Sequence, residues 1–393
     1  MPEAVIVSTA RTPIGRAFKG SLTDQRPDDL AAFIVKEALG KVPEVDPATV
    51  EDIMLGCGLP GGEQGFNMAR VVAILAGMDG VPGTTVTRYC SSSLQTIRMA
   101  MHAIRAGEGD VFVAAGVETV SRFPMGTSDI GTCRNPKFAD AAKRTEERSV
   151  GGSPWTEPEG LPDIYIEMGQ TAENVAELEG VSRAEMDEFA ALSQQRAVHS
   201  QEIGFFEREI TPVTKDDGPR PGTTIEGLAQ LKPVFRPDGK CTAGNACPLN
   251  DGAAAVVVMS DTRARDLGIT PLARLVASGV SALNPEIMGL GPIEASRQAL
   301  ARAGMTMVDI DLVELNEAFA AQVIPAARAL EVEEDRLNVS GGAIALGHPF
   351  GMTGARIMTT LLNNLEHHDK HVGLETMCVG GGQGMAMIVE RLS

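Results

Sequence analysis

Three side chains with reactive chemistry stand in short runs of small residues. Cys90 follows a threonine-rich segment and precedes three serines, and Cys378 precedes Val-Gly-Gly-Gly-Gln-Gly. His348 is the only one of the six histidines that lies in glycine-rich sequence. Small neighbours allow a substrate and backbone N–H groups to approach a reactive atom closely. These residue types suggest a thiolate nucleophile, a histidine that takes its proton and a second thiol that acts as acid or base.

The predicted elements place both Cys90 and Cys378 at the end of a strand. The β-branched run 84–87 predicts a strand that leads to Cys90, and 91–106 predicts a helix directly after it. A helix N-terminus lowers the pKa of a nearby thiol, so we expect a low pKa for Cys90. A further strand leads to Cys378. Taken alone, each cysteine would more often be an inert buried residue, and His348 a structural one.

Strands and helices alternate along most of the chain, which indicates an α/β fold with helices around a sheet. Continuous apolar runs at 111–116 and 253–259 predict strands that are covered on both faces. The order strand, reactive residue, helix and apolar strand occurs in each half, so we expect a duplicated domain. Further strands are predicted at 4–7, 53–56, 274–279, 312–315 and 385–389, and further helices at 27–39, 67–76, 170–204, 292–303, 318–330 and 351–365.

The segment 121–249 has a different character from the rest of the chain. Glycine, proline and charged residues increase there, and 137–162 shows no clear periodicity. We expect an inserted domain that serves as a lid or binding loop. The chain then divides into a first half made of 1–120 and 250–270, the inserted domain, and a second half at 271–393.

Composition excludes several classes of function. The chain has 393 residues and a formal net charge of −18. This charge argues against a nucleic-acid partner and against an anionic membrane surface, which both bind concentrated basic faces. The longest apolar run is far shorter than a membrane span, and the N-terminus lacks the basic and apolar regions of a secretory signal. Six scattered cysteines without zinc-ligand spacing predict free thiols, no metal and a cytoplasmic location.

Four separated motifs resemble those of the thiolase family in their order and spacing. They are Tyr89-Cys90-Ser91-Ser92, Asn316-Glu317-Ala318-Phe319, the glycine-rich segment 341–356 and the segment 378–384. The resemblance covers nearly the whole chain. It implies the thiolase fold, in which two similar α/β halves stack as αβαβα layers and carry an inserted loop domain. It also implies a homodimer or a homotetramer.

The resemblance further implies CoA-dependent cleavage of a 3-ketoacyl-CoA to acetyl-CoA and a shortened acyl-CoA, which is a reversible Claisen condensation. Cys90 would be the nucleophile that carries the acyl group, His348 would activate it, and Cys378 would be the general acid and base. One oxyanion hole would use His348 and a water held by Asn316. The other would use the backbone N–H groups of Cys90 and Gly380.

The family pattern also indicates contacts to coenzyme A, which would be a co-substrate and not a tightly bound cofactor. Arg220 would face the adenosine or phosphate end. The pantetheine and acyl portions would contact Ala243, Gly244, Cys247, Met288, Phe319 and Met168. Cys247 stands where family members usually carry Ser, and Ser93 stands where they usually carry Gly. Glu167 replaces a His that is frequent in acetoacetyl-CoA-forming members, so we expect a degradative enzyme of fatty-acid β-oxidation.

Other interpretations stay open at this point. One is a biosynthetic acetoacetyl-CoA-forming acetyltransferase, and another is a catalytically silent lipid-binding protein with a thiolase-like fold. A ketoacyl synthase that uses carrier-protein thioesters fits less well, because such enzymes typically pair one Cys with two His and lack the motif at Cys378. A disulfide between Cys90 and Cys378 would also permit redox control, since both side chains must approach one substrate carbon.

Overall fold

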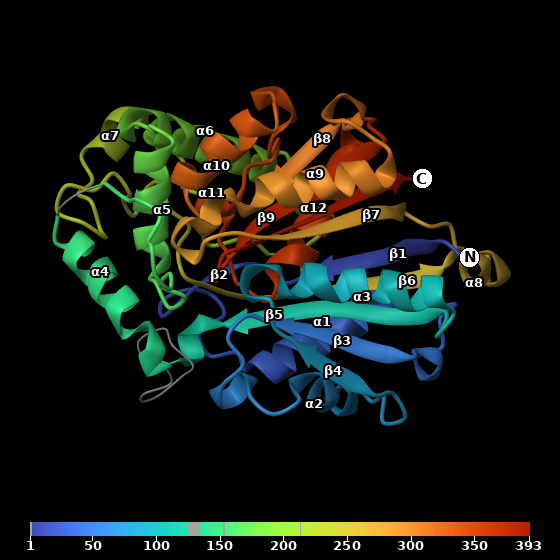
Figure 1. Ribbon diagram of the computed structural model, residues 1–393. Coiled ribbons are helices and arrows are strands. Elements are labelled where there is room, and N and C mark those ends of the chain that lie inside the picture. The colour runs from blue at the N-terminus through green and yellow to red at the C-terminus, as the bar shows by residue number, and fades with distance from the viewer. Residues whose placement is uncertain (1, 124–133, 152–153, 213) are drawn as a thin grey trace.

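A mixed β-sheet runs through the whole molecule, with helices on its faces (Figure 1). The computed structural model describes residues 2–123, 134–151, 154–212 and 214–393. The strand order is β4-β3-β5-β6-β1-β7-β10-β9-β8, and the short β2 pairs with β6. The strands are β1 Ala4–Arg11, β2 Gly15–Arg16, β3 Asp52–Cys57, β4 Gly83–Val86, β5 Val111–Thr119, β6 Asn250–Ser260, β7 Ala273–Ala282, β8 Leu312–Leu315, β9 Val372–Val379 and β10 Gln383–Arg391.

The two halves of the sheet repeat one topology, as the sequence predicts. In each half the first strand, β1 or β7, lies next to the last strand, β6 or β10. On the other side of β6 lies β5, and on the other side of β10 lies β9. Both β6 and β10 are antiparallel to their two neighbours. The halves meet where β1 pairs antiparallel with β7 at Val5–Arg274 and Ile6–Ala273. The expected duplicated fold is therefore confirmed.

Three clusters of buried apolar side chains lie between the layers of helices and strands. Successive residues of a strand point to opposite faces, so Val5 and Val7 pack beneath α1 and α2 while Ile6 packs in the central core with α3 and α12. Helices α9 and α10 cover the outer face of the second half. The layers therefore alternate as αβαβα. These helices are α1 Pro27–Gly40, α2 Met68–Leu75, α3 Ser92–Ala106, α9 Gly291–Ala303, α10 Ala320–Ala329 and α12 Thr353–His367.

The segment 121–249 contains four α-helices in the described ranges, and these helices gather at one end of the molecule (Figure 1). The remaining helices are α4 Ala139–Ser149, α5 Met168–Leu178, α6 Arg183–Glu202, α7 Ile225–Ala229, α8 Asp261–Leu267 and α11 Ala343–Leu346. Sequence periodicity missed α4 because only Ala141 of this polar helix is buried. No helix in the described ranges is both long and apolar enough to span a membrane.

The glycine-rich loop that carries His348 packs directly against the first half of the sheet. A Cβ atom on Gly351 would lie 2.3 Å from the carbonyl oxygen of Val117, and one on Gly116 would lie 2.0 Å from the carbonyl oxygen of Gly351. Only glycine permits this approach. Helix α12 therefore begins at Thr353, two residues later than predicted, and the loop that carries His348 is held against β5.

Candidate active site

Cys90 lies in a 3₁₀ turn, Tyr89–Ser91, between β4 and α3. Burial raises the pKa of its thiol to about 11, although the backbone N–H groups of Gly380 and of Cys90 itself favour the thiolate. The prediction of a low pKa is therefore wrong, because burial outweighs the helix N-terminus. The thiol is therefore protonated at neutral pH.

His348 is buried and held by hydrogen bonds at both ring nitrogens. Its Nδ1 lies 2.6 Å from the hydroxyl oxygen of Thr353, and that hydroxyl donates to the carbonyl oxygen of Pro349 at 2.8 Å. Because the hydroxyl proton is engaged, Nδ1 must carry the proton that it donates to Thr353. Burial and the charge of Arg356 lower the pKa of His348 to about 3, so the ring is neutral.

The other ring nitrogen, Nε2, carries no proton and accepts a hydrogen bond. Nε2 of His348 lies 3.3 Å from Nδ2 of Asn316, an amide group that only donates. The Oδ1 atom of Asn316 is buried and accepts no hydrogen bond from the described residues. This pair therefore offers a neutral proton acceptor beside a buried amide oxygen that can hold a water molecule by its hydrogen.

Glu317 supports this pair and was not identified from the sequence. Its carboxylate accepts hydrogen bonds from Ser193 at 2.6 Å, from Asn338 at 2.8 Å and from the backbone N–H of Ile344 at 3.1 Å. These contacts tie the residue after Asn316 to α6 and to the glycine-rich loop. The sequence signal was the motif Asn-Glu-Ala-Phe, but its partners lie far away in the chain.

Cys378 is fully buried near the end of β9. Burial raises the pKa of its thiol well above the ordinary value, and the nearby thiols of Cys90 and Cys247 raise this pKa further. Three cysteines thus gather at the site, and the described cysteines are all free thiols. Cys247 is fixed by a backbone hydrogen bond to Ala318 at 3.1 Å. No cluster suited to a metal ion occurs within the described ranges.

One small cavity contains several of the predicted coenzyme contacts. Arg220, Ala243 and Gly244 line one cavity of about 50 Å³, together with Arg16, which the sequence analysis missed. Burial and the neighbouring Arg16 lower the pKa of Arg220. Two cations therefore line one cavity in a chain that is strongly acidic overall.

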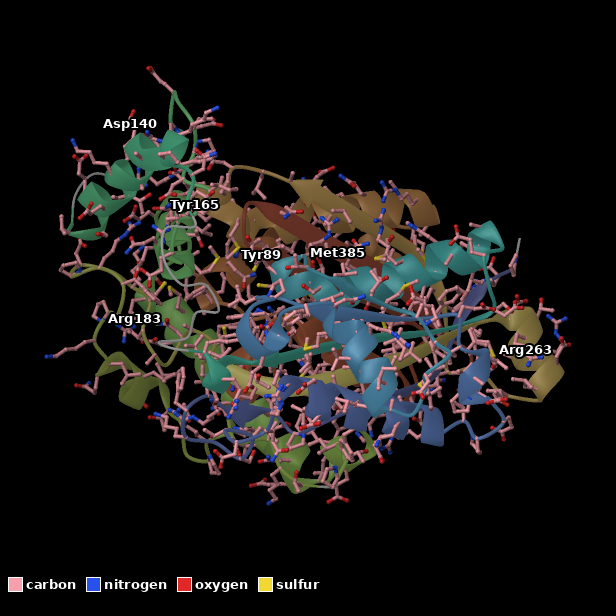
Figure 2. All side chains as sticks on the ribbon, turned by 90° about the horizontal axis from the view of Figure 1, so that it is seen from below. Tyr89, Asp140, Tyr165, Arg183, Arg263 and Met385 are labelled. Atoms are coloured by element: carbon pink, nitrogen blue, oxygen red, sulfur yellow. The ribbon has the colours of Figure 1, made fainter. Side chains whose placement is uncertain are left out.

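The apolar contacts predicted for the substrate surround Cys378. Met288 and Phe319 are buried in one cluster with Cys378, and Met168 packs against it. The sulfur of Met168 would lie 3.7 Å from a Cβ atom placed on Gly380. Tyr89 borders the same glycine turn, and Figure 2 shows it between the side chains labelled Tyr165 and Met385.

Ser93, the departure from the family pattern in the nucleophile helix, is fully buried and structural. Its hydroxyl oxygen accepts the backbone N–H of Ala355 at 2.9 Å. That N–H belongs to the first turn of α12 and has no partner within the helix. The extra hydroxyl therefore joins α3 to α12.

The amino-acid sequence is similar over nearly its full length to proteins of a known family. The models "Thiolase, N-terminal domain" and "Thiolase, C-terminal domain" match residues 4–262 and 269–391. A 3-ketoacyl-CoA thiolase of Bacillus subtilis is 42% identical, over 99% of this chain and 100% of that protein. A beta-ketoadipyl-CoA thiolase of Acinetobacter baylyi is 43% identical, with 100% of both chains covered. The crystal structure of the Bacillus anthracis acetyl-CoA acetyltransferase superposes with a TM-score of 0.88 at 37% identity, covering 100% of this chain and 99% of that one.

Proposed function

The chain belongs to the thiolase family and is an acyltransferase with thiolase activity, and from that premise we propose which residues carry the reaction. Cys90 is the nucleophile, His348 its base and Cys378 the second acid and base. The observation that carries this assignment is the approach of the Gly380 N–H and of the Cys378 thiol to the Cys90 thiol. The neutral His348 beside Asn316 supports it.

The first half of the reaction breaks the carbon–carbon bond. Cys90 gives its proton to Nε2 of His348, and its sulfur attacks the C3 carbonyl carbon of a 3-ketoacyl-CoA. The C2–C3 bond breaks, the electron pair passes to the enolate of acetyl-CoA, and Cys378 protonates that enolate at C2. The N–H groups of Cys90 and Gly380 stabilise the first oxyanion, and each such donor is worth about 3–4 kcal/mol.

The second half releases the shortened acyl group. The thiol of an incoming CoA gives its proton to the Cys378 thiolate, and its sulfur attacks the thioester carbon on Cys90. Cys90 leaves as a thiolate and recovers its proton from His348. In the first half of the reaction, the Asn316–His348 pair stabilises the oxygen of the acetyl-CoA enolate. It stabilises the same enolate when the reaction runs in the direction of condensation.

Arg220 and Arg16 would bind the phosphate end of CoA. The support is that both cations line one cavity, since an acidic chain repels a polyanionic substrate elsewhere. Cys247 would contact the pantetheine arm in place of the usual Ser. The cavity is lined largely by the segment 121–249, in keeping with a division into 1–120 plus 250–270, 121–249 and 271–393.

The enzyme would act in degradation, on more than one chain length. Glu167 stands where acetoacetyl-CoA-forming members often carry His, and it is exposed before α5. The test is CoA-dependent loss of 3-ketoacyl-CoA absorbance over chain lengths from four to sixteen carbons. We expect cleavage of several chain lengths. Strict use of acetoacetyl-CoA would identify a biosynthetic acetyltransferase, and no cleavage at any length would indicate the silent lipid binder.

The chain would assemble as a homo-oligomer through the free edge of β4. Among the described residues, this strand ends the sheet and pairs only with β3. Apolar side chains beside it are unusually exposed, namely Phe66 at 98%, Ile74 at 47%, Leu75 at 44% and Val71 at 40%. Two such edges related by a twofold axis would continue the sheet and cover these side chains. A cytoplasmic location is proposed on the basis of the free thiols.

A further inference from the structure

One buried carboxylate close to the active site has no role in the mechanism proposed above. Glu118 lies at the carboxyl end of β5 and is fully buried. All four of its hydrogen-bond partners in the described ranges are neutral groups. A buried carboxylate without a cationic partner is costly unless hydrogen bonds replace the water that it has lost. Such a group calls for an explanation.

Four donors hold Glu118 in its charged form. Its Oε2 accepts the backbone N–H groups of Gly58 at 2.7 Å and Gly351 at 2.8 Å. Its Oε1 accepts the backbone N–H of Leu59 at 3.2 Å and Nε2 of Gln64 at 2.6 Å. Burial raises the pKa of Glu118, but these four hydrogen bonds oppose the rise. Because every partner donates, the form that fits is the ionised carboxylate, which only accepts.

The Oε2 atom of Glu118 joins two segments that are far apart in the sequence. Gly58 begins the loop after β3, and Gly351 lies in the turn 349–353 that follows His348. A Cβ atom on Gly58 would lie 2.7 Å from Oε2, and one on Gly351 would lie 2.8 Å from the Cα atom of Cys57. The junction has room for backbone alone, so the carboxylate oxygen determines closely where Gly351 lies.

The turn 349–353 is braced by its own hydrogen bonds. The backbone N–H groups of Met352 and Thr353 both donate to the carbonyl oxygen of Pro349 at 3.1 Å. The hydroxyl of Thr353 donates to the same oxygen at 2.8 Å and accepts the Nδ1 proton of His348. A displacement of Gly351 in the middle of this turn would therefore carry the imidazole ring with it.

Other side chains hold the loop on the opposite side of His348. The Oδ1 atom of Asn250 accepts the backbone N–H of His348 at 3.0 Å, and Glu317 accepts that of Ile344 at 3.1 Å. Both contacts lie at or before His348, whereas the contact with Glu118 fixes the turn after it.

Glu118 also lies near the nucleophile. Burial raises the pKa of Cys90 to about 11, and the charge of Glu118 adds to that rise. The carboxylate thus disfavours a free thiolate at Cys90 while it fixes the loop of the base that would take the proton.

We propose that Glu118 is a positioning residue of the reaction, which fixes His348 for proton transfer through the backbone N–H of Gly351. This inference rests on the proposed function, since it concerns the base that serves Cys90. The carboxylate itself touches neither substrate nor the reacting atoms and acts through the turn 349–353.

The first test is Glu118→Gln in the assay of CoA-dependent loss of 3-ketoacyl-CoA absorbance. The variant keeps the size of the side chain, but whichever way it turns, its NH2 group faces two of the four donors. We expect kcat to fall about 10–100-fold, because small displacements of a catalytic group have effects of this size. KM should stay within about twofold of the wild-type value. An unchanged kcat would overturn the inference.

The double variant Glu118→Gln/His348→Asn separates positioning from a general structural role. A structural role would lower kcat by the same factor whether or not His348 is present. If Glu118 acts through His348, Glu118→Gln should lower the residual kcat of His348→Asn by less than about threefold. Equal factors in the two backgrounds would overturn the inference. No thiolysis by the wild type, or full activity of His348→Asn, would instead contradict the proposed function.

Asp311→Asn is the matched control. The Oδ2 atom of Asp311 also accepts two backbone N–H groups, those of His371 at 3.0 Å and Val372 at 2.9 Å, but at the end of β9 remote from Cys378. This variant should leave kcat unchanged.

Glu118→Asp is the second variant, which keeps the charge but shortens the reach by one methylene, and it serves if Glu118→Gln does not fold. It should lower kcat and speed hydrogen–deuterium exchange in the peptide that contains 349–353. Wild-type kcat and exchange in Glu118→Asp would overturn the inference.

Discussion

Cys90 and His348 both lie where burial favours their uncharged forms. Burial raises the pKa of Cys90 to about 11 and lowers that of His348 to about 3. At a pH between these two pKa values, Cys90 and His348 are therefore both uncharged in the resting state and do not form an ion pair. In the proposed mechanism the proton moves when the substrate arrives, because fixed N–H donors would stabilise the oxyanion that forms. The proposed site would thus generate its nucleophile only when a substrate is bound.

Thr353 is the residue whose removal tests this arrangement of protons. Thr353→Val keeps the shape of the side chain but removes the acceptor of the Nδ1 proton of His348. The other tautomer, with its proton on Nε2, then becomes available, and it cannot accept a proton from Cys90. We expect kcat for thiolysis to fall about 10–100-fold, the usual effect of losing a group that orients a histidine, with KM nearly unchanged.

Thr353→Ser is the control for that substitution, because serine retains the hydroxyl group. It should keep kcat within a few-fold of the wild-type value. Equal losses in the two variants would mean that Thr353 acts through packing in α12 and not through the histidine tautomer.

At the scale of single residues, sequence reasoning selected the reactive groups that stand beside small residues. Cys90, His348 and Cys378 stand in motifs that can be read along the chain. Thr353 and Arg16 were missed because their roles depend on partners that only folding brings close. The low pKa expected for Cys90 failed for the same reason, since the sequence showed the helix N-terminus but not the depth of burial.

At the scale of elements, a charged layer lies between β8, β9 and α12. Glu314 and Glu375 are direct neighbours across the two strands, and both are fully buried. Arg356 of α12 lies close enough to lower the pKa of both carboxyl groups, but burial outweighs it and raises the pKa of Glu314 to about 8. These strands and this helix lead directly to Asn316, Cys378 and Thr353, so the layer supports the active site.

The pKa of Glu314 predicts how stability depends on pH. Its folded pKa of about 8 lies above its ordinary value of 4.5. A raised pKa gives stability that is complete below the ordinary value and is lost as pH rises toward the folded value. The apparent Tm of the wild type should therefore fall between pH 5 and pH 8.5.

Glu314→Gln removes the titrating group and keeps the hydrogen bond with Asn364 within reach. Over the same pH range, the fall in its Tm should be about 2–4 °C smaller than the fall in the Tm of the wild type, as followed by circular dichroism. Glu226→Gln, which changes an exposed carboxylate, should behave as the wild type does. Parallel pH profiles for the wild type and Glu314→Gln would contradict the assignment.

At the scale of the whole molecule, the proposed oligomer makes its own prediction. Ile74 is 47% exposed on α2 beside the free edge of β4. Ile74→Asp would place a charge in the contact between two copies, so the native mass should fall to that of one chain in analytical ultracentrifugation. Val308→Asp, at a residue that is 89% exposed elsewhere, should leave the mass unchanged. An assembled Ile74→Asp variant would exclude this face.

The overall architecture was largely predictable, because strands with continuous apolar sequence and a repeated order of elements indicate a duplicated α/β fold, and the resemblance to the thiolase family implied its αβαβα layers. The arrangement of strands within the sheet was not, because the pairing of β1 with both β6 and β7 joins residues about 250 positions apart. The helical nature of 139–149 was also hidden, since that helix buries almost no apolar surface.

The most direct test of the central claim is detection of the acyl group on Cys90. The wild type is mixed with a 3-ketoacyl-CoA in the absence of free CoA, quenched in acid and analysed by peptide mass spectrometry. We predict a mass increase equal to the shortened acyl group on the peptide that contains Cys90, lost on addition of CoA and absent from Cys90→Ala. An acyl group on Cys378 or Cys247, or turnover by Cys90→Ala, would contradict the account.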